Sequence, residues 1–289
     1  VHRLTGIPFS FTARGSDVQA DGHMLRQKVE ACDFVISVSE YNKEIILRKC
    51  GPGFGKKIHV IHGGVDVDRL VPGPECGANT LLRILCVARF EGVKGHTYLV
   101  EACRVLKERG LDFECRLIGD GPLVPQIENQ IKRSGLSGEV LLLGPQPYDE
   151  VIEQFSRADV VVLATAPTAS GKREGIPNVL KEAMACGVPV VAIASGGIPE
   201  LVDETCGILV HPRDAAAIAD ALRRLYDQPA LRRLMGISGR EKIVREFNLN
   251  LSTAMRAELF SRSADGYRSR QGVADTRQTE SALVTQRSA

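Results

Sequence analysis

The chain has 289 residues, which is long enough for two domains of ordinary size. Its 37 basic and 35 acidic side chains nearly cancel, so the charge does not indicate a polyanion-binding protein. It has no Trp and only 5% aromatic residues, which argues against a stacking platform for nucleic acid.

Cysteine usage and hydropathy point to a reducing compartment. Eight cysteines are scattered without a Cys-x-x-Cys pair, a pattern that favours buried, reduced thiols over a disulfide framework or a metal cluster. No signal peptide and no apolar stretch long enough to cross a bilayer occur, so we expect a cytoplasmic protein. The sequence begins at Val1 without Met, and we expect it to be a piece whose beginning is missing.

Residues 1–68 are predicted to form part of an α/β domain. Apolar runs at 7–13, 34–38 and 57–61 predict three buried strands with helices between them. Ser39 is typical of a helix N-cap, because an acidic residue follows it. This alternation predicts the second half of a doubly wound domain whose opening strands are absent.

Residues 69–80 are rich in Pro and Gly and are predicted to link two domains. Asp66-Val67-Asp68, just before them, formally matches an Asp-x-Asp metal-binding pattern. Because this segment follows a glycine turn and precedes the linker, we interpret it as a helix start or a hinge contact, and we predict no metal site.

Residues 81–246 are predicted to form a second α/β domain. The expected strands lie at 82–88, 113–118, 140–143, 160–164 and 188–194. Their unbroken apolar runs are typical of a parallel sheet covered on both faces. Gly119 and Gly121 follow the second of these strands, where they either allow a ligand to approach the backbone or simply form a turn.

A helix from about Pro177 to Cys186 is predicted at the centre of this domain. Pro177 suits the first helical turn, and Gly187 suits the position beyond the last one. The helix therefore begins near the carboxyl end of a strand, where open α/β sheets bind ligands. Its free N–H groups at Gly175, Ile176 and Asn178 favour an anion such as a phosphate.

Charged side chains surround this predicted anion site. Glu174 precedes the helix and Glu182 lies on it, one turn after Asn178, and a carboxylate accepts hydrogen bonds from a diol. Arg89 and Lys94 bracket the loop after the first strand of the domain, so that both cations can close over one anion. Hydroxyls that flank a charged centre are the pattern of a nucleotide sugar.

The C-terminal region is predicted to be helical and then disordered. Residues 247–262 are expected to form a helix that returns to the first domain, and 263–289 a disordered tail. Residues 165–173 form either a mobile flap or a tolerated insertion. Arginines at 223, 224, 232 and 233 either make a peripheral contact with anionic lipid or are solvated.

The segment that begins Arg173-Glu174-Gly175-Ile176-Pro177 resembles the donor-site signature of family-four glycosyltransferases, and the resemblance extends over roughly residues 5–260. It implies an α/β, GT-B-like fold with two Rossmann-like doubly wound domains, the first one incomplete. It also implies transfer of a hexose from a UDP- or GDP-sugar to a glycan or lipid-linked acceptor hydroxyl, with retention and without a metal cofactor. The form of the motif resembles members that build bacterial exopolysaccharide.

The resemblance also assigns roles to individual residues. Donor-binding residues would be Arg89 and Lys94 on the diphosphate, Glu182 on the ribose diol, Glu174 on the sugar hydroxyls, and backbone groups at Gly121, Gly175, Ile176, Pro177 and Asn178. Of these, Glu174, Arg89 and Lys94 would also act in catalysis. Arg14, Gly15 and Asp17 would face the acceptor, although the family usually has His where Arg14 stands.

Two other functions stay open at this point. The protein is a nucleotide-sugar-binding protein without transferase activity if Arg14 and the missing first strands abolish transfer. A sugar epimerase on the same architecture would need acid and base residues that the sequence does not reveal.

Overall fold

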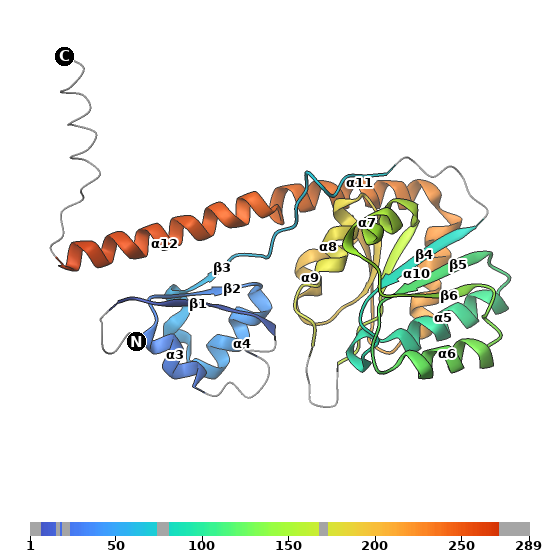
Figure 1. Ribbon diagram of the computed structural model, residues 1–289, viewed down its shortest axis with the longest axis horizontal. Helices are drawn as coiled ribbons and strands as arrows, with labels where there is room; N and C mark the ends of the chain where they lie inside the picture. Colours follow the sequence, from blue (N-terminus) through green and yellow to red (C-terminus); the bar gives the residue numbers. More distant parts are fainter. Residues whose placement is uncertain (1–6, 16–17, 19–23, 74–80, 168–172, 272–289) are drawn as a thin grey trace, which may run out of the picture.

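The computed structural model describes residues 7–15, 18, 24–73, 81–167 and 173–271. It consists of two α/β units, each built on a parallel sheet, and a long C-terminal helix, α12, runs back from the second unit to the first (Figure 1). The predicted fold class, with two Rossmann-like units of which the first is the smaller, is confirmed.

The first unit is a three-stranded parallel sheet in the order β1-β2-β3. Its strands are β1 (Ser10–Ala13), β2 (Phe34–Ser37) and β3 (Ile58–Val60). The accompanying helices are α3 (Leu25–Ala31), α4 (Glu40–Cys50) and the 3₁₀ turn η1 (Pro52–Lys57). Ser39 caps α4 as predicted, since its side chain accepts a hydrogen bond from the backbone N–H of Asn42. The strands are shorter than the apolar runs of the sequence, since only part of each run pairs with a neighbouring strand.

The second unit is a six-stranded parallel sheet in the order β6-β5-β4-β7-β8-β9. Its strands are β4 (Leu82–Val87), β5 (Phe113–Ile118), β6 (Val140–Gly144), β7 (Val160–Leu163), β8 (Val190–Ile193) and β9 (Gly207–Val210). This is the strand order of a dinucleotide-binding sheet, and the order reverses between β4 and β7. The predicted strands are all present, with ends that differ by a few residues.

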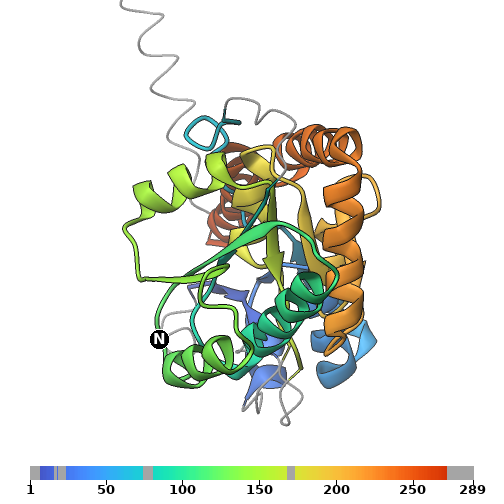
Figure 2. The ribbon, with the colours of Figure 1, turned by 90° about the vertical axis from the view of Figure 1, so that its right-hand side faces the viewer.

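Helices cover both faces of this sheet (Figure 2). They are α5 (His96–Glu108), α6 (Val124–Arg133) and α10 (Ala215–Asp227) on one face, and α7 (Tyr148–Arg157), α8 (Asn178–Ala185), α9 (Ile198–Leu201) and much of α11 (Pro229–Glu246) on the other. Val160 and Val162 of β7 enter the first of these cores, and Val161 and Leu163 enter the second. Burial on both faces explains why the strands are unbroken apolar runs.

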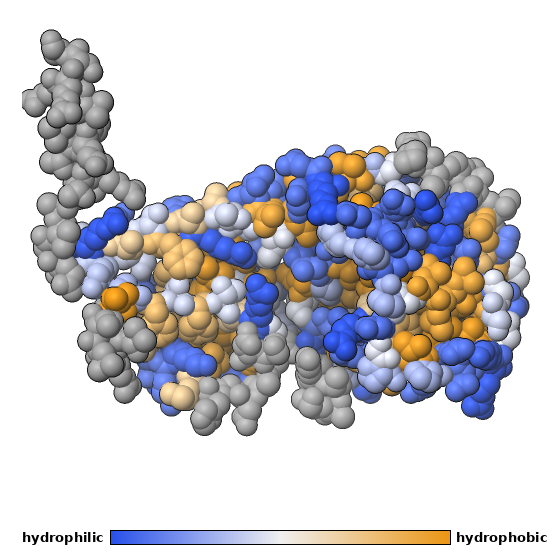
Figure 3. Space-filling model, in the orientation of Figure 1, coloured by the Kyte–Doolittle hydropathy of each residue, from blue (hydrophilic) through white to orange (hydrophobic). Residues whose placement is uncertain are grey.

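The helix α12 (Leu249–Gln271) is longer than predicted. Residues 263–271 are helical, so the prediction of a disordered tail from 263 is wrong for this part, and 272–289 lie outside the described residues. The Ser263 hydroxyl, at the start of this extension, donates to the Asp33 carboxylate, and the ring of Phe260, within the predicted helix, lies 5.3 Å from that of Phe34. Polar and apolar side chains are interspersed on the face of α12 that Figure 3 shows.

The hinge between the units is packed tightly against the start of α12. Val65 forms a bridge with Asn248, and a Cβ added at Gly64 would lie 2.4 Å from Cα of Leu249. Asp66 closes a turn, because its carboxylate accepts hydrogen bonds from the N–H groups of Asp68 and Arg69 at 3.1 Å each. This confirms a hinge contact rather than a helix start.

Other sequence predictions concern metal sites, thiols and membranes. Within the described ranges, no group of three or more His, Cys, Asp or Glu side chains is arranged to hold a metal ion. The described cysteines are free and buried. None of the helices in the described residues is long and apolar enough to span a membrane. Arg232 is only 8% exposed, so it neither contacts anionic lipid nor is solvated, and both alternatives are wrong for this residue.

A substitution of Gly95, at the start of α5, tests how tightly the loop after β4 packs against the segment after β7. Gly95 has φ of 68°, and a Cβ there would lie 1.7 Å from the carbonyl oxygen of Ala164, whereas Gly110 has φ of 69° and open space around it. Gly110→Ala should cost about 1–2 kcal/mol of unfolding free energy through left-handed strain alone. Gly95→Ala should cost about 1–3 kcal/mol more, because backbone must move. Equal losses in chemical denaturation would contradict this packing.

Candidate functional site

The candidate site lies where the strand order reverses. The loop after β4 and the loop after β7 meet beyond the carboxyl ends of these neighbouring strands, and the N–H of Ala166 donates to the carbonyl of Val93 at 2.9 Å. Adjacent strands whose connections leave toward opposite faces open a crevice at this point. The predicted residues Arg89, Lys94 and Glu174 lie on these two loops.

Lys94 and Glu174 form an ion pair in this crevice. The Lys94 Nζ lies 2.8 Å from Oε1 of Glu174, and their side chains are only 23% and 19% exposed. The two residues are far apart in the sequence, and the structure brings them together as the predicted site requires. A ligand with one anionic and one hydroxyl group can therefore engage both.

Arg89 lies in the same loop but remains accessible. Its side chain is 67% exposed, and its Nε lies 3.3 Å from a carboxylate oxygen of Glu91. An exposed ion pair of this kind contributes little to stability. The guanidinium can therefore exchange Glu91 for a ligand anion at low cost.

Gly119 and Gly121 are explained by packing of the backbone. They have φ of 137° and 146°, and added Cβ atoms would lie 2.2 Å from the Ala88 carbonyl oxygen and 2.7 Å from that of Phe90. The turn therefore supports the loop that carries Arg89. A direct contact of Gly121 with a ligand stays a prediction.

The segment before α8 is fixed by the loop after β8. A Cβ on Gly196, which has φ of 63°, would lie 1.9 Å from the carbonyl oxygen of Glu174. The Gly197 N–H also donates to that oxygen, at 3.4 Å. The backbone at Glu174 and Gly175 is thus held in place by two successive glycines.

The helix α8 begins one residue later than predicted. Pro177 is its N-cap rather than its first residue, because Pro177 has ψ of 134°, which is extended. No side chain of the described residues caps this end, and Asn178 is exposed. The first N–H groups of α8 thus have no side-chain partner among the described residues, and their contact with an anion stays a prediction.

Glu182 lies further along α8 and faces Tyr148 of α7. The Tyr148 hydroxyl donates to Glu182 Oε1 at 3.4 Å, and the Arg69 guanidinium lies 5.0 Å from the Tyr148 ring. Burial raises the pKa of Glu182, and it is the main cause that raises the pKa of Tyr148 to about 12. The Glu182 carboxylate thus has a hydrogen bond with tyrosine, and its predicted contact with a ribose diol stays a prediction.

Two buried polar residues of the site have no clear signal in the sequence. Lys181 is 2% exposed and donates to the carbonyl of Gly63 in the hinge at 2.5 Å. His96 is also 2% exposed and stacks on Phe90 with 4.1 Å between ring centroids. Both residues lie on helices that carry polar as well as apolar side chains, and nothing in the sequence marks these two polar side chains as buried. Only tertiary packing reveals their burial.

Burial lowers the pKa of both side chains. Burial, followed by the charge of Lys94, lowers the pKa of His96 to about 4, so the ring is neutral at pH 7. Burial likewise lowers the pKa of Lys181 to about 8, although the charge of Glu182 opposes this shift, and the charges of Arg256 and Arg14 add to it.

The residues predicted on the acceptor side are only partly described. Arg14 is exposed at the carboxyl end of β1, and Gly15 is helical, whereas Asp17 lies outside the described residues. The charge of Arg14 is one of the causes that lower the pKa of Lys181 in α8.

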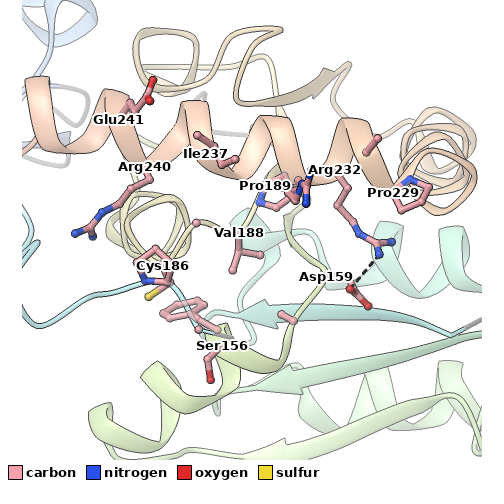
Figure 4. Close-up of a pocket in the computed structure, with 17 residues that line it drawn as sticks. Ser156, Asp159, Cys186, Val188, Pro189, Pro229, Arg232, Ile237, Arg240 and Glu241 are labelled. Atoms are coloured by element: carbon pink, nitrogen blue, oxygen red, sulfur yellow. Dashed lines mark ion pairs between the residues drawn. The ribbon is translucent and has the colours of Figure 1, made fainter. Parts of the chain in front are cut away.

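A cavity of about 660 Å³ lies elsewhere (Figure 4). It is lined by Cys186 at the end of α8, Pro189 before β8, and Asp159 before β7, at the amino ends of the strands. Its buried Arg232–Asp159 ion pair, at 3.4 Å, connects α11 to the sheet. Since the loops that carry the predicted residues lie at the opposite ends of the strands, this cavity is not the candidate site.

Comparisons with known proteins identify relatives of this chain. A family model described as "Glycosyl transferases group 1" matches residues 78–242. The amylovoran biosynthesis glycosyltransferase AmsK of Erwinia amylovora is 36% identical over 210 residues, which are 72% of this chain and 52% of that protein. The chain thus spans about half the length of this curated relative.

Two further proteins broaden the comparison. A GDP-mannose-dependent alpha-(1-6)-phosphatidylinositol monomannoside mannosyltransferase of Mycolicibacterium smegmatis is 30% identical over 247 residues, covering 82% of this chain and 64% of that protein. The crystal structure of Anabaena Alr3699/HepE in complex with UDP and glucose superposes with a TM-score of 0.75, at 20% identity, over 90% of this chain and 73% of that one. At this identity the structural likeness shows the fold alone.

Lys181 makes the stability of the protein depend on pH. Burial lowers its pKa from the ordinary value of 10.5 to about 8 in the folded protein, so between these values the unfolded state binds more protons. The unfolding free energy of the wild type should therefore rise from about pH 8 to 10.5 relative to Lys181→Met. Denaturant titrations across this range measure the difference. A difference that stays constant with pH would contradict the burial of this amine.

Proposed function

The chain belongs to the group 1 glycosyltransferase family, and we propose that it carries the donor site of an enzyme that transfers a hexose from a UDP- or GDP-sugar. The acceptor is a hydroxyl of a glycan or a lipid-linked sugar, and the configuration of the transferred sugar is retained. The chain spans about half of relatives such as AmsK, so this activity is proposed for the whole protein.

The Lys94–Glu174 pair is the observation that carries this proposal. The pair is 2.8 Å apart and lies beside the uncapped start of α8. A nucleoside diphosphate sugar presents a diphosphate next to sugar hydroxyls, so it can bind the amine and the carboxylate together. Arg89, which is largely exposed, would close onto the same diphosphate.

The carboxylates of Glu174 and Glu182 bind different hydroxyl groups of the donor. Glu182 accepts hydrogen bonds from the ribose diol, and Glu174 accepts them from the hexose hydroxyls. Backbone N–H groups at the start of α8, with Gly121 and the segment Gly175–Pro177, line the diphosphate. The carboxylate of Glu174 pairs only with the Lys94 side chain and that of Glu182 with the Tyr148 side chain, and a ligand can replace either partner.

The cations also act in the chemical step. As the bond between the anomeric carbon and the phosphate oxygen breaks, Arg89, Lys94 and the α8 N-terminus stabilise the negative charge on the leaving diphosphate. The acceptor oxygen bonds to the anomeric carbon on the same face, and its proton passes to the departing phosphate oxygen. No metal ion and no protein base is assigned a role in this scheme.

Names of relatives support the substrate classes. The Mycolicibacterium relative is named GDP-mannose-dependent, and the Anabaena structure contains UDP, so either base is compatible with the site. The Erwinia relative is named for biosynthesis of a polysaccharide. We place the protein at the inner face of the plasma membrane, where lipid-linked acceptors are found, with only peripheral membrane contact.

A second candidate, a nucleotide-sugar-binding protein without transferase activity, is favoured by one observation. Arg14 stands at the predicted acceptor position, where the resembled family usually has His. Donor binding and transfer must therefore be measured separately.

Nucleotide binding is the first test. UDP or GDP at about a hundred times its dissociation constant should stabilise the chain by about 2.7 kcal/mol. The melting temperature should rise with one of these nucleotides, but not with ADP, and EDTA should leave the rise unchanged. Absence of a shift with UDP and GDP would refute the donor site in this chain.

Glu174→Gln separates binding from turnover. Because Glu174 and the diphosphate compete for Lys94, UDP or GDP should bind this variant as well as the wild type or better. Release of nucleotide from the matching nucleotide sugar should fall by about a hundredfold, since hydrogen bonds formed in the transition state are lost. Glu128→Gln, which breaks the exposed Glu128–Lys132 pair of 2.7 Å, is the matched control and should change neither quantity. Equal turnover in both variants would exclude the role given to Glu174.

A further inference from the structure

Glu200 belongs to the second unit, but its carboxylate contacts the first. It lies in the short helix α9, where Oε2 accepts a hydrogen bond from the backbone N–H of Glu40 at 2.8 Å, and Oε1 accepts one from that of Tyr41 at 2.7 Å. Its side chain is 21% exposed, so these bonds are largely shielded from water. Glu200 is not among the proposed donor-binding residues.

The two N–H groups belong to the first turn of α4. Ser39 satisfies only the N–H of Asn42, so those of Glu40 and Tyr41 lack a partner within the helix. A carboxylate is also favoured here by the positive end of the helix dipole. The capping of α4 is therefore shared between a side chain of its own unit and one from the other unit.

The same carboxylate reaches the hinge. The His62 Nε2 lies 3.2 Å from Oε2 of Glu200, and the His62 ring stacks on Phe247 with 4.8 Å between centroids. Burial raises the pKa of Glu200, but its hydrogen bonds to His62, Tyr41 and Glu40 outweigh burial and hold the pKa below its ordinary value. The group thus stays ionised at neutral pH and joins the hinge to both units.

Glu200 is also rigidly connected to the donor site. It lies just after Gly196 and Gly197, whose backbone contacts the carbonyl oxygen of Glu174. The side chain of Glu174 pairs in turn with Lys94. A continuous set of contacts therefore runs from the start of α4 in the first unit to the reacting end of the proposed donor.

We propose that Glu200 is a positioning residue that holds the first unit closed over the donor site, so that the acceptor is aligned with the sugar. This inference rests on the proposed function. The donor residues all belong to the second unit, so nucleotide binding does not require the Glu200 contact, whereas transfer to an acceptor does. When Glu200 releases α4, the units separate and the acceptor side loses its alignment.

The direct test follows the contact itself. In Glu200→Ala the Tyr41 amide should exchange its hydrogen about ten times faster or more, because each bond to a charged acceptor is worth at least a factor of ten. Small-angle X-ray scattering should show a more extended particle. Glu204→Ala, which removes an exposed carboxylate from the same region, is the control and should change neither measurement.

A second pair of variants tests the contact from the first unit and leaves Glu200 in place. Glu40 is the first residue of α4, where Pro is tolerated, and Ser39 before it is extended, so Glu40→Pro removes one N–H donor without breaking the helix. Glu40→Ala keeps that N–H and loses the same weak ion pair with Lys43. The Pro variant should reproduce the extended particle of Glu200→Ala, and the Ala variant should not.

Activity then separates positioning from donor binding. In Glu200→Ala and Glu40→Pro, the melting shift with UDP or GDP should equal that of the wild type, while sugar transfer to a lipid-linked acceptor falls about tenfold or more. If the wild type binds neither nucleotide, the proposed function fails, but amide exchange and scattering still test the contact. Unchanged exchange and scattering in Glu200→Ala, or identical behaviour of the Pro and Ala variants, would overturn the inference.

Discussion

The reversal of strand order between β4 and β7 is the constraint on which the donor site depends. Connections leave these neighbouring strands toward opposite faces of the sheet, so their carboxyl ends border a crevice that no crossover fills. Lys94 and Glu174 meet there because one follows β4 and the other follows β7. The pairing of β4 with β7 thus brings these two residues together although they are far apart in the sequence.

Glycines turn this crevice into a rigid site. Gly95, Gly121 and Gly196 each bring a loop within van der Waals distance of the backbone of another loop, in conformations that other residues rarely adopt. The charged side chains are thereby positioned by backbone packing rather than by their own mutual attraction. Such preorganisation is what electrostatic stabilisation of a leaving group needs.

Paired charges at the site keep its buried groups compatible with folding. Glu174 pairs with Lys94, Glu182 accepts a hydrogen bond from Tyr148, and Glu200 caps α4. An unpaired charge of comparable burial would destabilise the fold. Two of these partners, Lys94 and Tyr148, are side chains that a ligand can displace, whereas the partners of Glu200 on α4 are backbone N–H groups, which suits a structural contact.

The sequence by itself determined the α/β class, the strands of the parallel sheets, the limits of α8 to within one residue, and the candidate donor residues, because apolar periodicity and turn residues act locally. Tertiary structure alone decided that Lys94 pairs with Glu174, that Lys181 and Arg232 are buried, and that Glu200 reaches α4. It also placed α12 against the first unit, through Phe260 on Phe34 and Ser263 on Asp33, which are contacts between distant segments. Such contacts join residues far apart in the chain, and a polar or charged residue shows no local sign of the partner that folding will give it.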